Sequence, residues 1–116
     1  VNDFDAAVAK AKSAKKRVFV DFTGYTCTNC RWMEANIFPQ PAVGREMQKF
    51  VLLRLYTDGD GEIYRRQQQL EEKMFGTVAL PFYAILEPDG RPIATFPGLT
   101  RNENEFVDFL RKSLEN

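Results

Sequence analysis

Histidine is missing from this sequence of 116 residues, and cysteine occurs only twice, at Cys27 and Cys30. Without histidine, nucleophilic hydrolysis of the cysteine–histidine type is excluded. A zinc site is disfavoured, because zinc usually takes four ligands and carboxylates or a second chain would have to complete the set. Three interpretations of the cysteine pair therefore remain to be weighed: a redox centre, a structural disulfide and half of a metal site.

Net charge is also absent, since 16 basic residues balance 16 acidic ones. A neutral chain gives no electrostatic reason to propose a nucleic-acid or membrane-surface partner. The basic run over residues 10–17 is expected to form the solvated face and end of a helix. No stretch approaches the roughly 18 apolar residues of a membrane span, so we expect no direct membrane insertion of this segment.

The chain opens on Val1 without a signal peptide or an initiator methionine. We expect residues 1–116 to form a single domain that is processed or excised from a longer protein. Its 44% apolar composition and ten phenylalanines are enough for a continuous core.

Apolar patterns predict an α/β fold with a helix before the first core strand. Strands joined through helices should be parallel and the last two should form an antiparallel hairpin, so the central sheet is mixed and flanked by helices. Its centre is expected at residues 17–23 and the neighbouring strands, because these runs lack polar alternation. Helices are predicted over residues 3–17, 30–38, 41–50, 62–75 and 100–116, and strands over 17–23, 51–57, 78–87 and 92–96.

Cap and face residues are predicted for three of these helices. Asn2 or Asp3 is the expected N-cap of the first helix. Thr100 has capping-box spacing to Glu103 in the last helix. The inner face of the helix over residues 62–75 is assigned to its apolar residues, Ile63, Leu70 and Phe75.

The two cysteines fall where the first strand ends and a helix begins, which is where α/β sheets form sites. A helix N-terminus stabilises a thiolate, and in such motifs the pKa of the first thiol falls from about 8.5 to between roughly 3.5 and 7.5. Cys27 is expected to face solvent and attack a partner's disulfide, and Cys30 to lie deeper and resolve the mixed disulfide. A structural disulfide closing so small a loop would contribute only roughly 2 kcal/mol.

The stretches VFVDFTGYTCTNCRWME and LPFYAILEPDG resemble the thioredoxin superfamily, and the resemblance extends over nearly the whole chain. More narrowly, they resemble the C-terminal periplasmic domains of the DsbD thiol:disulfide interchange proteins. Three features carry the narrower resemblance: Asp21 six positions before the first cysteine, Arg31 and Glu34 after the second, and the pair Leu80-Pro81. The resemblance implies a thioredoxin fold.

The resemblance also draws attention to two carboxylates. Asp21 is predicted inside an apolar strand, where burial should raise its pKa and fit it to exchange a proton with Cys30. Glu34 lies one helical turn beyond Cys30 and could share that task while opposing a thiolate. The alternative for Glu34 is an exposed helix residue paired with Arg31.

A substrate-binding surface is implied beside the cysteines. Pro81 matches the cis-proline of the family, so Leu80 would present its backbone to an extended substrate strand. The alternative is an ordinary trans proline at the start of a strand. Tyr25 and Thr26 stand before the first cysteine, where thioredoxins usually carry tryptophan, and are assigned to the same surface. Trp32 is either a gate to the site or part of the core.

The resemblance implies a thiol–disulfide oxidoreductase that acts as a reductant. The residues agree with this direction, because no cation on the helix side is placed to depress the Cys27 pKa strongly and Glu34 opposes the thiolate. It would relay electrons from a membrane-embedded thiol carrier, within the same polypeptide, to extracytoplasmic protein disulfides. We expect a monomeric periplasmic domain tethered to the inner membrane, with no bound cofactor and no metal. The alternatives are a free-standing thioredoxin-like reductase and a redox-inert binding module with a structural disulfide.

Overall fold

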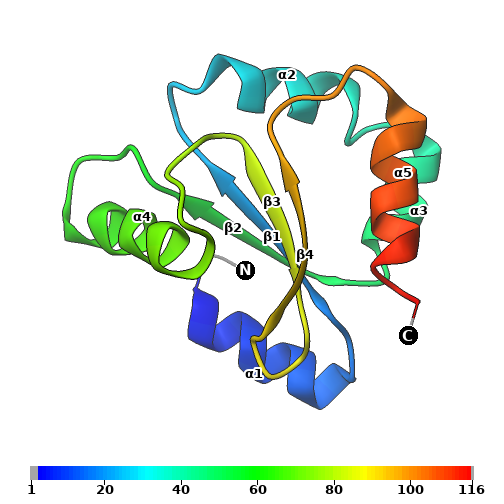
Figure 1. Cartoon of the computed structure of the whole chain (residues 1–116), viewed down its shortest axis with the longest axis horizontal. Helices are drawn as coiled ribbons and strands as arrows, with labels where there is room; N and C mark the ends of the chain where they lie inside the picture. Colours follow the sequence, from blue (N-terminus) through cyan, green and yellow to red (C-terminus); the bar gives the residue numbers. More distant parts are fainter. Residues whose placement is uncertain (1–2, 116) are drawn as a thin grey trace.

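A computed structural model describes residues 3–115, so the candidate cap Asn2 lies outside the described residues. A four-stranded mixed sheet in the order β2-β1-β3-β4 forms the centre of the molecule (Figure 1). Its strands are β1 (Val18–Thr23), β2 (Val51–Tyr56), β3 (Phe82–Leu86) and β4 (Pro92–Pro97). Five helices surround them: α1 (Phe4–Ala14), α2 (Thr28–Asn36), α3 (Pro41–Met47), α4 (Glu62–Phe75) and α5 (Glu103–Lys112).

Strand β1 is a central strand, as the apolar run predicted, and all six of its residues are buried. It pairs in parallel with β2 and antiparallel with β3, and β3 forms the expected antiparallel hairpin with β4. The expectation that β2 would also be central is wrong. It is an edge strand whose residues alternate between buried and exposed, and Arg54 occupies one of the exposed positions.

Helices cover both faces of the sheet, and each layer has its own core (Figure 1). Because side chains alternate along a strand, Val18, Val20 and Phe22 of β1 face the layer of α1 and α4. Phe19 faces the layer of α2, α3 and α5. Asp21, two residues from Phe19, is directed to that same layer, which also contains the helix that follows the cysteines.

Helix starts and faces correct two of the sequence expectations. Asp3 is the N-cap of α1, and its side chain accepts a hydrogen bond from the backbone of Ala6. The capping box is wrong: Asn102, not Thr100, caps α5. The inner face of α4 includes Leu70 and Phe75 as expected. Ile63 does not belong to it: this residue lies in the first turn of the helix and is 58% exposed.

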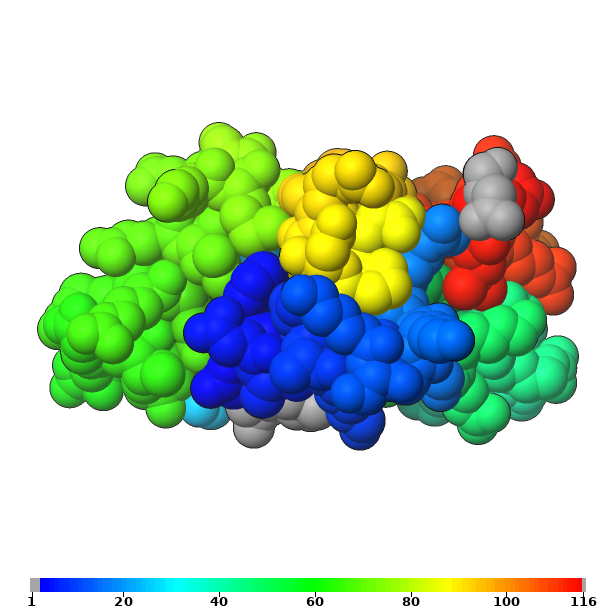
Figure 2. All heavy atoms as spheres, turned by 90° about the horizontal axis from the view of Figure 1, so that it is seen from below, coloured from blue at the N-terminus to red at the C-terminus, as the bar shows by residue number. Residues whose placement is uncertain are grey.

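The basic run includes the C-terminal part of α1 and the residues after it. Figure 2 shows this helix lying across the near side of the molecule. Lysines 10, 12, 15 and 16 are all exposed, which confirms a solvated helix face. Within residues 3–115, no helix combines the length and apolar character needed to cross a membrane.

Candidate redox site

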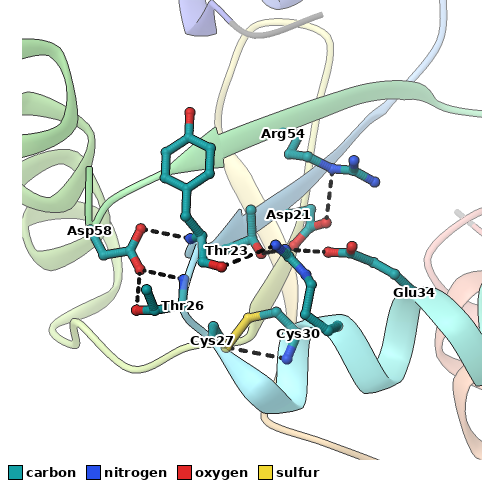
Figure 3. Close-up of polar contacts among 10 residues, drawn as sticks. Asp21, Thr23, Thr26, Cys27, Cys30, Glu34, Arg54 and Asp58 are labelled. Atoms are coloured by element: carbon teal, nitrogen blue, oxygen red, sulfur yellow. Dashed lines mark hydrogen bonds and ion pairs between the residues drawn. A yellow bond between two sulfur atoms is a disulfide. The ribbon is translucent and has the colours of Figure 1, made fainter. Parts of the chain in front are cut away.

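The cysteine pair lies at the junction between β1 and α2, as predicted. Cys27 is the N-cap of α2, and its sulfur accepts a hydrogen bond from the backbone N–H of Cys30 at 3.2 Å. The two cysteines form a disulfide (Figure 3). Cys27 is half-buried whereas Cys30 is only 1% exposed, so a partner can reach the first sulfur far more easily than the second.

This position suits thiol chemistry. The N–H groups of the first helical turn are not used within the helix, and they favour a negative charge at the cap position. After reduction, the Cys27 thiolate would sit against that end of α2 while Cys30 stays behind it.

Asp21 is buried on β1, the strand that leads to the cysteine pair, with 4% of its surface exposed. Burial raises its pKa to about 7; Arg54 lowers the pKa and Glu34 raises it. The Nε atom of Arg54 lies 3.5 Å from Oδ2 of Asp21, because the parallel register of β1 and β2 places the two residues opposite each other. The predicted rise is confirmed, although the carboxyl has an ion-pair partner that the sequence did not disclose.

The Asp21 carboxyl is not sealed off from its surroundings. Its Oδ1 atom is buried without a hydrogen-bond partner in the described part of the chain. Asp21 and Arg54 also line a cavity of about 200 Å³, together with apolar side chains that include Phe19, Phe38 and Leu53. A carboxyl with a pKa near neutrality, at the wall of a cavity, can exchange protons readily.

Glu34 is held by Arg31, which was the alternative considered for it. The guanidinium of Arg31 binds the Glu34 carboxylate at 2.8 Å and donates to the hydroxyl of Thr23 at 3.1 Å. The Glu34 side chain is 25% exposed, and its charge still raises the pKa of Asp21. Arg31 thereby links α2 to the end of β1, and two ion pairs, Arg54–Asp21 and Arg31–Glu34, lie in the region of β1 and α2 that also holds the cysteines (Figure 3).

The residues assigned to the substrate surface lie near one another. The Leu80-Pro81 peptide bond is cis, as the family resemblance implied. Leu80 approaches Gly24 of the segment before the cysteines, where a Cβ atom would stand 3.0 Å from Leu80 Cδ1. Tyr25 and Thr26 are both exposed.

Trp32 packs against the core of the α2, α3 and α5 layer, which favours the core interpretation for this residue. The guanidinium carbon of Arg101 lies 5.0 Å from the centre of its ring, within the range of a cation–π contact.

Sequence reasoning missed Asp58, which lies in the turn between β2 and α4. The Asp58 carboxylate accepts hydrogen bonds from the backbone N–H groups of Tyr25 and Thr26 and from the Thr26 hydroxyl (Figure 3). A carboxylate just after a strand that runs parallel to β1 was the available signal, because the carboxyl ends of parallel strands meet at one edge of the sheet. Sequence reasoning also missed Tyr56 and Tyr64, whose rings contact the ring of Tyr25.

A mixed sheet covered by helices on both faces, with a C-x-x-C disulfide at the N-terminus of the helix that follows its central strand, is the arrangement of a thiol–disulfide oxidoreductase. The family model described as thioredoxin-like matches residues 1–88, and the chain belongs to that family.

Two curated relatives, the thiol:disulfide interchange proteins DsbD of Vibrio vulnificus strains CMCP6 and YJ016, are each 30% identical over 96 residues. The match covers 81% of this chain and 15% of each relative, so the chain spans a small part of their length.

Solved structures share the fold. A thioredoxin from Thermus thermophilus superposes with a TM-score of 0.78 at 23% identity, covering 96% of this chain and 83% of the other. The oxidised C-terminal domain of Neisseria meningitidis DsbD superposes with a TM-score of 0.77 at 19% identity, covering 94% of this chain and 90% of that one. At these identities the likeness concerns the fold alone.

Proposed function

We propose that this domain is a reductant that relays electrons from a thiol donor to the disulfides of extracytoplasmic proteins. The observation that carries the proposal is the Cys27–Cys30 disulfide at the N-terminus of α2, preceded by a strand that buries a carboxyl of raised pKa. The match to the thiol:disulfide interchange protein DsbD supports thiol–disulfide exchange as the reaction. The periplasmic location, and a membrane domain of the same polypeptide as the donor, are part of the proposal.

In the first step, the Cys27 thiolate of the reduced domain attacks one sulfur of a partner's disulfide. A new bond forms between Cys27 and that sulfur, the partner's S–S bond breaks, and its other sulfur leaves as a thiolate that takes up a proton. Cys27 is suited to this step because it is the more accessible sulfur and caps the helix. Leu80, Pro81, Tyr25 and Thr26 would contact the partner's chain around the reacting sulfurs.

In the second step, Cys30 resolves the mixed disulfide. Its thiol gives its proton to the Asp21 carboxylate, and the resulting thiolate attacks the Cys27 sulfur. The bond between Cys27 and the partner breaks, and the partner's second sulfur leaves as a thiolate that takes up a proton from solvent. The domain's dithiol is oxidised to a disulfide while the partner's disulfide is reduced to two thiols. Asp21 suits the proton transfer because a pKa of about 7 leaves both of its protonation states populated near neutral pH. The Glu34 carboxylate assists by raising that pKa.

A donor dithiol then reverses the sequence: it reduces the Cys27–Cys30 disulfide, and Asp21 returns its proton to Cys30. The electrons are carried by the cysteine pair itself. No further group is needed for the reaction to balance.

Mixed-disulfide trapping tests the proposal. The reduced domain, freed of excess reductant, is mixed with a protein that contains one accessible disulfide, and free thiols are counted on both proteins. We expect two thiols to appear on the partner for each two lost from the domain. Cys30→Ser should accumulate a stable mixed disulfide through Cys27, whereas the matched variant Cys27→Ser should form none.

Two outcomes would contradict the proposal. Absence of any exchange would make the domain a binding module with a permanent disulfide. Net transfer in the other direction, in which the oxidised domain forms disulfides in a reduced partner, would make it a disulfide donor.

A further inference from the structure

The segment before Cys27 is tied to the turn after β2 by one carboxylate. Asp58 accepts the backbone N–H of Tyr25 at 2.7 Å with Oδ1, and the backbone N–H and hydroxyl of Thr26 at 3.0 and 2.9 Å with Oδ2 (Figure 3). The bonds join parts of the chain that lie 32 and 33 residues apart. They end on the residue directly before the attacking cysteine.

Gly24 lets the carboxylate come this close. A Cβ atom at this position would stand 2.7 Å from Asp58 Oδ2 and 2.9 Å from its Cγ, distances that side chains do not tolerate. The carbonyl of Gly24 in turn accepts the backbone N–H of Cys27 at 3.3 Å. Residues 24–27 are therefore fixed by the carboxylate and by their own turn.

The ring of Tyr25 adds to this anchoring. It stacks on Tyr56 with the ring centres 4.0 Å apart and makes an edge contact with Tyr64, whose hydroxyl lies 3.1 Å from its own. Tyr56 is the last residue of β2 and Tyr64 lies near the start of α4, so the two flank the turn that contains Asp58. The segment is consequently held by side chains of β2, of α4 and of the turn that joins them.

Asp58 is ionised at neutral pH. Partial desolvation raises the pKa of its carboxyl, but the hydrogen bonds donated by Thr26 and Tyr25 outweigh this effect and hold the pKa below its usual value. A fixed negative charge therefore lies against Thr26, one residue from the sulfur that must itself become negative. Like charges at such range disfavour each other's ionised form.

We propose that Asp58 is a positioning residue of the redox site: it fixes the segment before Cys27 and places beside that sulfur a negative charge that limits the stability of its thiolate. A thiolate that is not over-stabilised makes the reduced pair a better electron donor. The inference rests on the proposed function, since it concerns the same cysteine pair and explains how the chain sets its direction of transfer.

A pH titration of Cys27 in the reduced protein, monitored by the absorbance of the thiolate, tests this role. Asp58→Asn removes the charge and keeps an oxygen acceptor. We expect it to raise the ionisation constant of Cys27 about threefold to tenfold, as removal of one nearby charge in a largely aqueous setting should. The pH profile for attack on a small reporter disulfide should move to lower pH by the same factor.

Asp60→Asn is the matched control, because Asp58 and Asp60 are both exposed carboxylates of the same turn, but among the described residues only Asp58 accepts hydrogen bonds from Tyr25 and Thr26. We expect it to change the ionisation constant less than about twofold, since a solvated charge that is not held against the segment before Cys27 is screened. Asp58→Glu keeps the charge and should stay close to the unmodified chain. The other charges around the cysteines, those of Asp21, Arg31, Glu34 and Arg54, are untouched in all three variants.

Equal shifts in Asp58→Asn and Asp60→Asn, or no shift in either, would overturn the proposal and leave Asp58 a structural tether. If Asp58→Asn does not fold, Asp58→Ser removes the same charge from a smaller side chain and carries the same expectation. The titration requires no exchange partner. A domain that ionises as expected but exchanges with nothing would refute the proposed function and not the role of Asp58.

Discussion

Two buried carboxyls, Asp21 and Glu71, lie on opposite faces of the sheet and have very different surroundings. Asp21 is 4% exposed and faces the layer of α2, whereas Glu71 is fully buried on α4 in the other layer. Burial raises the pKa of Asp21 to about 7 and that of Glu71 to about 8. By burial alone, the two would be equally good candidates for an acid–base catalyst.

Their neighbours separate them. Asp21 has Arg54 as an ion-pair partner, lines a cavity and faces the layer that contains α2, the helix of Cys30. Within residues 3–115, neither carboxyl oxygen of Glu71 has a hydrogen-bond partner, and burial is the sole cause of its raised pKa. A raised pKa therefore records the cost of burying a carboxyl. It contributes to function only where a group that gains or loses a proton lies within reach.

Replacing each carboxyl by its amide should show the largest difference between the two residues. We expect Asp21→Asn to slow release of the partner from the mixed disulfide by about 100-fold, the lower range for loss of a general acid–base group. The inflection near pH 7 in the rate of release should disappear with it. Glu71→Gln should leave both unchanged. Rapid acid quenching followed by separation of the mixed disulfide measures the rate, and equal slowing in the two variants would contradict the assignment.

The pH dependence of stability should show the opposite ranking. The folded-state pKa of Glu71 is about 8, above its ordinary 4.5, so the folded state binds the extra proton between these values. Stability is then fully present below pH 4.5, falls as the pH rises, and levels off above pH 8.

Urea unfolding of the disulfide form at pH 6 and pH 9 tests this ranking. Glu71→Gln should remove about 2 kcal/mol of the fall in unfolding free energy between these pH values, after allowance for partial hydration. Asp21→Asn should remove only about 1 kcal/mol, because the pKa of Asp21 lies closer to the lower pH. A larger fall in stability in the Glu71→Gln protein than in the unmodified chain would reverse the sign and refute the account.

The smallest expected effect is that of Arg54, the ion-pair partner of Asp21. Arg54 lowers the pKa of Asp21, and 44% of its side chain is exposed, so its influence is screened. Arg54→Gln should therefore move the inflection in the release rate upward by only about half a pH unit. Arg65→Gln, which removes an exposed arginine of α4 that pairs with Glu62, should leave the inflection in place. A downward movement in Arg54→Gln would show that the ion pair does not act on Asp21.

Local patterns in the sequence were enough to predict the central strand, the position of the cysteines and the terminal hairpin. An apolar run without alternation, a C-x-x-C at its end and a turn with Pro88, Asp89 and Gly90 each depend on neighbours in the chain. Asp21 was predictable because it is the one charge in VFVDFT, an otherwise uncharged strand with no polar alternation. The residue is conspicuous against that background.

The remaining features depend on pairings that the sequence does not specify. Arg54 became a partner of Asp21 only through the register of β1 with β2, and Asp58 reached Tyr25 only because both strands end at the same edge. Glu71 stands among polar residues on α4, where its burial could be read only from its four-residue spacing to Phe75. Side-chain partners across more than 30 residues require the fold to be known first.

The reduction potential of the Cys27–Cys30 pair, measured by equilibration with a glutathione buffer at neutral pH, tests the central claim most directly. A reductant that relays electrons should lie between about −230 and −270 mV. A value near about −120 mV would contradict the claim and make the domain a disulfide donor. A value well below about −300 mV, with no exchange with small thiols, would contradict it by showing a structural disulfide.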